Sequence, residues 1–195
     1  MTIRTLHLGR TAKITLLRGM ATLAVLAGLY VLHLLTSQNF HTVIAGELYR
    51  SSQPSPASIA LYKEQHGIRS IVNLRGIRPD EGWYRDEVAT AARLGLNHFD
   101  FPMSATKELA PDEVKRLITL MKHAPKPLLI HCKAGADRTG LAAAFYMAAV
   151  AGRDELSAEL QISITYGHFS GFLSQARAMD ETFEKMEPYL GFPNS

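Results

Sequence analysis

Cysteine is nearly absent from this sequence, and so is any cluster of metal ligands. Cys132 is the only cysteine among 195 residues, so the chain cannot form an internal disulfide framework. Eight histidines are present, but His98, His123 and His168 are scattered without the spacing that metal ligands require. The sequence therefore predicts no metal site and no cofactor.

Acidic residues are missing from the first 46 positions, where Arg4, Arg10, Lys13 and Arg18 supply the charge. The first acidic residue is Glu47. The whole chain has a formal net charge of +3, but without those four residues it holds 17 basic and 18 acidic residues. Because a near-neutral remainder lacks the basic stripe typical of nucleic-acid binding, we expect no nucleic-acid partner.

A long uncharged run overlaps the end of this basic stretch. Gly19 to Leu35 carries no formal charge and would span about 26 Å as a helix. Extended back to Ile14, with Arg18 reaching the interface, it would span about 33 Å, enough to cross a bilayer. The positive-inside rule places the N-terminus in the cytoplasm and the remainder outside it, in the periplasm if the source is a Gram-negative bacterium. A cleavable signal peptide is the competing interpretation, although no Ala-x-Ala triplet follows the run.

The run His-Cys-Lys-Ala-Gly-Ala-Asp-Arg-Thr-Gly, which begins at His131, places five residues between Cys132 and Arg138. It follows an apolar stretch at 126–130, predicted as a buried strand, and precedes an apolar stretch at 141–150, predicted as a buried helix. A loop on a helix N-terminus points backbone N–H groups inward, where the helix dipole helps them bind a tetrahedral oxyanion. The spacing therefore predicts a phosphate-binding loop.

The side chains of this loop suit cleavage of a phosphate ester. Its positive field is expected to hold the pKa of Cys132 well below the free value of about 8.5, giving a thiolate for in-line attack and a cysteinyl-phosphate intermediate. Arg138 offers two phosphate oxygens a planar fork of donors, and Thr139 can donate to the sulfur when it leaves. His131 is expected to fix the loop. The predicted phosphate-binding residues are Lys133, Ala134, Gly135, Ala136 and Arg138.

The loop resembles the signature His-Cys-x5-Arg-Ser/Thr of the protein tyrosine phosphatase superfamily, in its dual-specificity and lipid-phosphatase branch. Looser similarity covers about Glu47 to Gly191, where Leu48–Pro54 and Ile71–Gly76 resemble segments of compact bacterial and fungal dual-specificity phosphatases. The resemblance implies a phosphoric monoester hydrolase with the α/β cysteine-phosphatase fold. In that fold a central, mostly parallel sheet is flanked by helices, and here one N-terminal transmembrane helix would precede it.

The order of predicted elements agrees with an α/β fold, because strands alternate with helices along the chain. Beside the strand entering the loop and the helix leaving it, we predict strands at 48–51, 68–74 and 97–101, and helices at 55–66, 80–94, 111–123, 154–166 and 173–186. The predicted segments are a basic cytoplasmic tail over 1–18, a transmembrane anchor or signal peptide over 14–36, a tether over 37–46 and a phosphatase domain over 47–191.

The usual general acid of these enzymes is missing. Many of them carry an Asp shortly after a strand-ending Pro, whereas Pro102 is followed by Met-Ser-Ala. Asp137 is the best replacement, because Cys-x-x-Gly-x-Asp-Arg resembles bacterial lipid-and-protein phosphatases and myotubularins, where an Asp before the Arg is proposed as the acid. A nearby phosphate dianion would raise its pKa in the required direction. Asp100 and Glu108 are the alternatives.

Several cationic and aromatic residues near the predicted site each have two interpretations. Lys133 either adds charge for polyanionic substrates or is a solvated charge at the rim. Arg50 and Arg75 are either cations of the pocket wall or exposed charges at strand ends. Trp83 and Tyr84 either line the rim of the substrate site or pack their helix.

We therefore expect a single-pass, membrane-anchored cysteine phosphatase whose first candidate substrate is phosphotyrosyl protein, with dual specificity left open. A phosphoinositide or another small phosphate ester is the alternative, because pocket depth decides between them. Two alternative functions from other classes of protein stay open. The chain could be a catalytically weak phosphate-binding regulatory module or a rhodanese-type sulfurtransferase. The expected partners are a phosphorylated substrate and the membrane.

Overall fold

A computed structural model describes residues 10–171 and 174–192 of the chain. The chain divides into two compact units, Met1–Ser37 and Gln38–Ser195. The first contains the helix α1, Arg10–Thr36, which is about 40 Å long at the usual rise. Among the described residues it is the one helix long and apolar enough to cross a membrane, and it buries none of that apolar stretch. The predicted basic tail is described only in part, because residues 1–9, Arg4 included, lie outside the described ranges.

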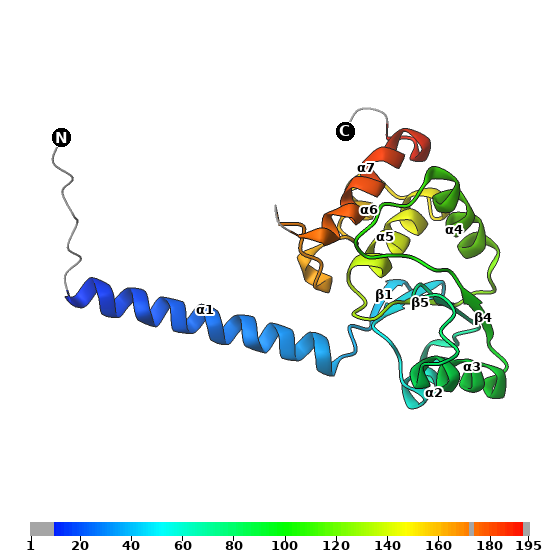
Figure 1. The fold of residues 1–195 in the computed structure, drawn as a ribbon, viewed down its shortest axis with the longest axis horizontal. Helices are drawn as coiled ribbons and strands as arrows, with labels where there is room; N and C mark the ends of the chain where they lie inside the picture. Colours follow the sequence, from blue (N-terminus) through cyan, green and yellow to red (C-terminus); the bar gives the residue numbers. More distant parts are fainter. Residues whose placement is uncertain (1–9, 172–173, 193–195) are drawn as a thin grey trace. The chain divides into compact units, whose positions relative to one another are not determined.

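The second unit is built on a five-stranded sheet with the order β1-β2-β5-β3-β4 (Figure 1). The edge strand β1 pairs antiparallel with β2, and all other neighbours are parallel. This confirms the predicted α/β fold with a mostly parallel sheet. The strands are β1 His41–Ile44, β2 Leu48–Ser51, β3 Ser70–Asn73, β4 Asn97–Asp100 and β5 Leu128–His131.

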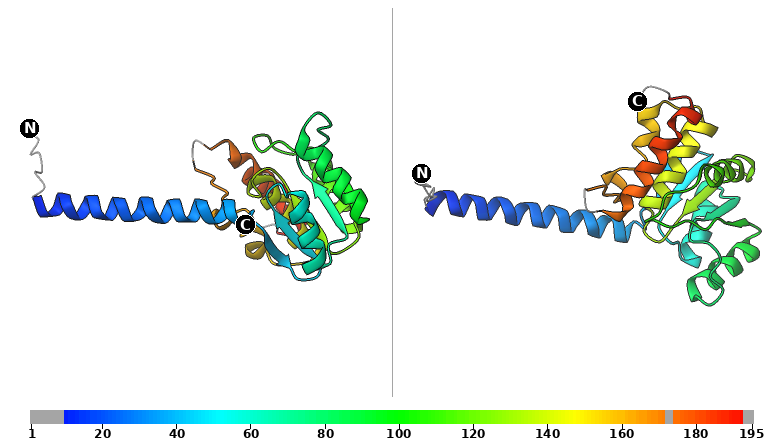
Figure 2. Two further views of the ribbon diagram at one scale, coloured as in Figure 1. Left: turned by 90° about the horizontal axis from the view of Figure 1, so that it is seen from below. Right: turned by 45° about the horizontal axis from the view of Figure 1, so that its top comes forward.

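Helices cover both faces of the sheet, with α2 and α3 on one side and α4 to α7 on the other (Figure 1). In the right-hand view of Figure 2, α5 and α7 run side by side, and the rings of Phe145 and Phe183 lie 5.9 Å apart between them. A π-helical turn, Tyr146–Val150, extends α5, and two 3-10 turns occupy Ile164–Tyr166 and Gln175–Arg177. The α-helices are α2 Pro56–His66, α3 Gly82–Leu94, α4 Pro111–His123, α5 Asp137–Phe145, α6 Glu155–Glu159 and α7 Ala178–Leu190.

Strand β5 lies at the centre of the sheet and is buried on both faces. Leu128 and Ile130 belong to the large core beneath α4, α5 and α7, whereas Leu129 belongs to a smaller core on the α2 side. Successive side chains of a strand point to opposite faces, so this uniformly apolar strand must be covered twice. Its carboxyl end therefore opens at the middle of the sheet edge, where the predicted loop follows.

Local signals in the sequence set the ends of several helices. The hydroxyl of Ser55 accepts a hydrogen bond from the N–H of Ser58 at 3.1 Å, which caps α2, and Gly67 ends the same helix with φ of +68°. Pro111 begins α4, as the sequence predicted.

Two predictions about elements need correction. Residues 41–44, within the segment predicted as a tether, form β1, and their Val and Ile suit a strand. The helix predicted over 154–166 ends at Glu159. The chain after it crosses α5 so closely that a Cβ on Gly140 would lie 2.8 Å from the carbonyl oxygen of Gln161, so tertiary packing overrides helix propensity there. The start predicted for the last helix, Leu173, lies outside the described residues, and α7 begins at Ala178.

Candidate active site

The loop that carries the candidate nucleophile joins the end of β5 to the start of α5. Cys132 is 2% exposed, and its Sγ accepts a hydrogen bond from the N–H of Gly135 at 3.3 Å. Gly135 has φ of +73°, and a Cβ there would lie 2.6 Å from the backbone N of Ser52. Only glycine fits this turn, because both the backbone angle and the approach of the neighbouring segment exclude a side chain.

Arg138 and Thr139 lie in the first turn of α5. The Arg138 guanidinium contacts the carbonyl oxygens of Leu74 and Met103 at 3.5 and 3.3 Å, so the ends of two neighbouring segments hold it. Its Nε and the Oγ1 of Thr139 are buried and make no hydrogen bond to any described residue. Buried donors of this kind usually have a partner, so these two, in the helical turn that follows the loop, suit a bound oxyanion.

Arg50 lies beneath the loop and is fully buried, so it is neither a wall cation nor an exposed strand-end charge. Its guanidinium donates to the carbonyl oxygens of Gly135 at 3.0 Å and Ala136 at 3.4 Å, and its NH1 donates to that of Gln161 at 2.8 Å. Burial lowers the pKa of Arg50 to about 10, opposed by Tyr166 and Cys132, so it stays charged at neutral pH. Arg50 holds these carbonyl groups on the outside of the loop. The backbone N–H groups of the loop are therefore favoured to point inward.

Other side chains brace the loop from either side. Asn39 donates to the carbonyl oxygen of Ala134 at 3.0 Å. His131 is fully buried, with Nε2 3.1 Å from a carboxylate oxygen of Glu87, and the same oxygen lies 2.7 Å from Nε2 of His98. Burial alone would raise the pKa of Glu87. The charge of His131 and the hydrogen bonds that the Glu87 carboxylate accepts instead lower that pKa to about 2. The loop is therefore anchored to α3 through a buried carboxylate.

The remaining predicted cations lie nearer the surface. Lys133 is exposed in the loop. The side chain of Arg75, which is 16% exposed, donates to Gln53 at 2.8 Å, pairs with Glu81 at 3.4 Å and stacks on the ring of Trp83 at 3.5 Å. Burial lowers the pKa of Arg75, although Glu81 opposes the shift. Trp83 thus packs against a cation at the end of β3.

The three candidate acids occupy different surroundings. Asp137 begins α5, and its Oδ1 lies 2.8 Å from Nδ1 of His168. Asp100 accepts hydrogen bonds from Asn73 at 2.8 Å and from Tyr84 at 2.7 Å. Burial and that hydrogen bond raise the pKa of Tyr84 to about 12, so Tyr84 remains a donor.

Glu108, the third candidate, pairs with Lys185 of α7. Of the three carboxylates, Asp137 is the one that belongs to the loop and its helix. Sequence reasoning missed the contribution of His168, because its position 31 residues after Asp137 follows no motif spacing.

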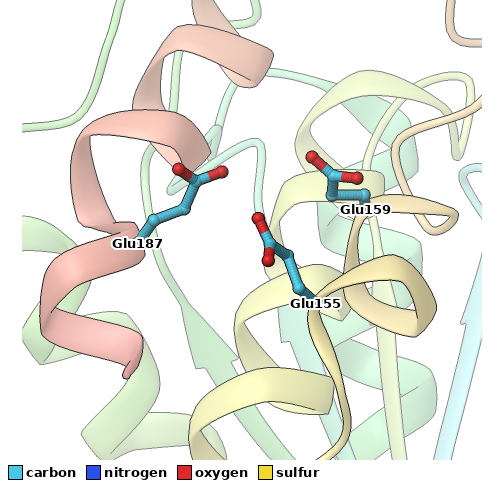
Figure 3. A group of neighbouring side chains, drawn as sticks. All are labelled: Glu155, Glu159 and Glu187. Atoms are coloured by element: carbon cyan, nitrogen blue, oxygen red, sulfur yellow. The ribbon is translucent and has the colours of Figure 1, made fainter. Parts of the chain in front are cut away.

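A group of three carboxylates lies on α6 and α7, outside this loop (Figure 3). Oxygen atoms of Glu155, Glu159 and Glu187 lie within 4.8 Å of one another, a spacing that a hard cation can bridge. Burial and the neighbouring carboxylates raise the pKa of Glu159. No motif spacing predicts this group, since Glu187 comes from a separate helix, and acidic residues alone assign no metal to it.

Solved structures share this fold. The structure of P. aeruginosa TpbA has a TM-score of 0.62 and 24% sequence identity, covering 82% of this chain and 93% of that one. A cysteine-to-serine variant of the same protein in complex with phosphotyrosine has a TM-score of 0.58 and 25% identity, covering 77% and 91%. The second unit of this chain therefore has the fold of these solved structures.

The family follows from the sequence of the domain. A profile described as "Swiss Army Knife protein, DSP-PTPase phosphatase domain" matches residues 37–182, and the chain belongs to this family. The inositol diphosphatase SIW14 of Saccharomyces cerevisiae is 33% identical over an alignment of 109 residues, and the match covers 53% of this chain. The match spans 37% of the length of that relative. The chain accordingly carries a phosphatase domain of the atypical, dual-specificity branch of the protein tyrosine phosphatase superfamily.

Proposed function

We propose that this chain is a membrane-anchored phosphatase that hydrolyses phosphotyrosine in proteins through a cysteinyl-phosphate on Cys132. One observation carries the proposal. Sγ of Cys132 accepts a hydrogen bond from the N–H of Gly135 at 3.3 Å, in the loop that leads into α5, and Arg138 and Thr139 in the first turn of α5 hold buried donors. This arrangement suits a thiolate beneath a bound phosphoryl group.

The proposed reaction has two steps. In the first, the thiolate of Cys132 attacks phosphorus, the bond from phosphorus to the ester oxygen breaks, and Asp137 gives its proton to that oxygen. In the second, water attacks the cysteinyl-phosphate, Asp137 takes a proton from the water, and the bond from phosphorus to sulfur breaks. Arg138 binds two phosphate oxygens throughout, and Thr139 donates to the departing sulfur.

Two substrate classes have support. The relative solved with phosphotyrosine favours a phosphotyrosyl protein. A polyanionic small ester, such as an inositol phosphate or a phosphoinositide, is favoured by the name of the curated relative and by the exposed charge of Lys133 beside the nucleophile. Arg75 at the end of β3 would add to that charge.

The membrane part of the proposal rests on α1. Its apolar stretch has a mean hydropathy of 1.8 and is not buried, and Arg10, Lys13 and Arg18 lie at its N-terminal end. The positive-inside rule then favours a cytoplasmic N-terminus and an extracytoplasmic catalytic domain. A reporter fused after residue 195 tests this: activity of a cytoplasm-only reporter would contradict the orientation. Release of a shortened, soluble chain would instead identify a cleaved signal peptide.

The catalytic proposal is tested with the full-length chain in detergent. Phosphate release is measured from a phosphotyrosyl peptide, a phosphoinositide and an inositol pyrophosphate, beside the Cys132→Ser variant. We expect turnover of the peptide and a loss on the order of 10⁴-fold or more in the variant, as when nucleophiles of other hydrolases are removed. Faster turnover of either inositol compound would reassign the substrate. Binding without turnover by the unmodified chain would identify a regulatory phosphate-binding module, and sulfide release from thiosulfate would identify a sulfurtransferase.

A further inference from the structure

His168 lies between two carboxylates that come from different helices. Its Nδ1 is 2.8 Å from Oδ1 of Asp137 at the start of α5, and its Nε2 is 2.9 Å from Oδ2 of Asp180 on α7. The imidazole is 2% exposed, whereas the carboxylate side chains are 27% and 25% exposed. A neutral imidazole carries one N–H, so only the imidazolium can donate to both carboxylates at once.

We propose that His168 is the positioning residue for Asp137 and shares with it the proton that the leaving group receives. The inference rests on the proposed function, in which Asp137 is the general acid. It addresses a difficulty in that function, because a carboxyl group with the ordinary pKa of about 4 has no proton to give at neutral pH.

The proton can be followed through one turnover. Before reaction, His168 is an imidazolium and Asp137 a carboxylate. When substrate is bound, the Nδ1 proton of His168 moves to Oδ1 of Asp137, which leaves the imidazole neutral. As the ester bond breaks, Asp137 gives that proton to the leaving oxygen. When water attacks the cysteinyl-phosphate, Asp137 takes a proton from the water and returns it to Nδ1. No proton is gained or lost by the pair over the cycle, and no further reactant is needed.

Asp180 has a fixed role in this arrangement. It lines a cavity of about 220 Å³ together with Glu159 and Glu184. Its carboxylate keeps the Nε2 proton in place throughout. Burial alone would lower the pKa of His168, but the hydrogen bonds and charges of Asp137 on α5 and Asp180 on α7 raise it above 6.5.

A purely structural role for His168 makes a different prediction. Such a role needs an N–H group at the position of Nδ1 to orient Asp137, and the side-chain amide of asparagine can supply one. Asparagine cannot carry a titrating proton. The variant His168→Asn therefore separates orientation from proton sharing.

The experiment uses the full-length chain in detergent with two substrates. One is a phosphotyrosyl peptide, whose leaving phenol has a pKa of about 10. The other is p-nitrophenyl phosphate, whose activated leaving group needs less help from an acid. The variants are His168→Asn and Asp180→Asn, and His123→Asn is the matched control because His123 is exposed and bonded only within α4.

We expect His168→Asn to lower kcat/KM for the peptide on the order of 10²-fold while changing kcat/KM for the activated ester less than about 3-fold. This ratio covers only the steps up to the cysteinyl-phosphate, so it excludes the attack of water that both substrates share. We also expect Asp180→Asn to move the alkaline fall of kcat to lower pH, because one of the carboxylates that holds the His168 proton is lost. Equal loss on both substrates, an unchanged peptide rate in His168→Asn or an unmoved alkaline limb in Asp180→Asn would each overturn the inference. Absence of turnover by the unmodified chain on both substrates would instead overturn the proposed function.

Discussion

The two sides of the candidate site are built in different ways. The nucleophile side, with Cys132, Arg138 and Thr139, comes from consecutive residues between one strand and one helix. The acid side is assembled from Asp137 and from His168 and Asp180, which lie much later in the chain. Anion binding by backbone amides is therefore a local property of this sequence, whereas supply of a proton depends on the packing of the C-terminal segment.

Among the variants that test this comparison, Gly135→Ala is expected to lower kcat most, because it changes the local, nucleophile side of the site. The added Cβ would lie 2.6 Å from the backbone N of Ser52 at a positive φ, so the loop must open and its amides turn away. We expect kcat to fall at least about 10²-fold, as with lost oxyanion donors, and the free energy of unfolding to fall about 2 kcal/mol. Steady-state kinetics and urea unfolding measure both. Gly46→Ala is the control, because Gly46 has φ of +74° but nothing within 4 Å of the added Cβ.

Arg50→Lys tests how strongly the conformation of the loop depends on Arg50, which lies 85 residues before Gly135 in the sequence. Lysine cannot hold the carbonyl groups of Gly135 and Gln161 together, since it lacks the planar fork. We expect the free energy of unfolding to fall about 3 kcal/mol and kcat to fall about 10-fold. Arg69→Lys, at an exposed position, serves as the control. An active, fully stable Arg50→Lys variant would show that the loop holds its form without this side chain.

Glu87→Gln tests the anchor behind the loop through its pH dependence. The pKa of Glu87 falls from 4.5 to about 2 on folding, so its contribution is complete above pH 4.5 and is lost as the pH falls through about 2. We expect the variant to lower the free energy of unfolding by about 3 kcal/mol near neutral pH and by much less at pH 3. Urea unfolding at both values measures this, beside the exposed Glu64→Gln. A pH-independent difference would contradict the account.

Glu108→Gln is expected to have the smallest effect, and it sharpens the assignment of the acid. Glu108 forms an exposed ion pair with Lys185, and such pairs contribute about 0–1 kcal/mol. We expect thermal stability and kcat for a phosphotyrosyl peptide to stay near those of the unmodified chain. A selective loss on the peptide, with p-nitrophenyl phosphate spared, would move the acid from Asp137 to Glu108.

The elements that sequence predicted well are those with local causes. The apolar run of β5, the Ser55 and Gly67 ends of α2 and the Pro111 start of α4 need no distant partner to be recognised. The residues between Cys132 and Arg138 are likewise readable as one loop, because the amides of consecutive residues form the cradle.

The elements that sequence missed depend on contacts made far along the chain. The helix predicted over 154–166 ends early because the carbonyl oxygen of Gln161 accepts a hydrogen bond from Arg50 and lies against Gly140. The strand β1 is short and acquires its identity by pairing with β2. The hydrogen bond between His168 and Asp137 exists only in the folded chain, so no sequence motif predicts it.

The lone, buried cysteine also governs how the enzyme recovers from oxidation. A sulfenic acid at Cys132 has no second cysteine in this sequence with which to form a disulfide, so its reduction requires a thiol from another molecule. That thiol must reach a sulfur that is 2% exposed beneath the loop. The size of the reductant, as well as its potential, therefore sets how quickly activity returns.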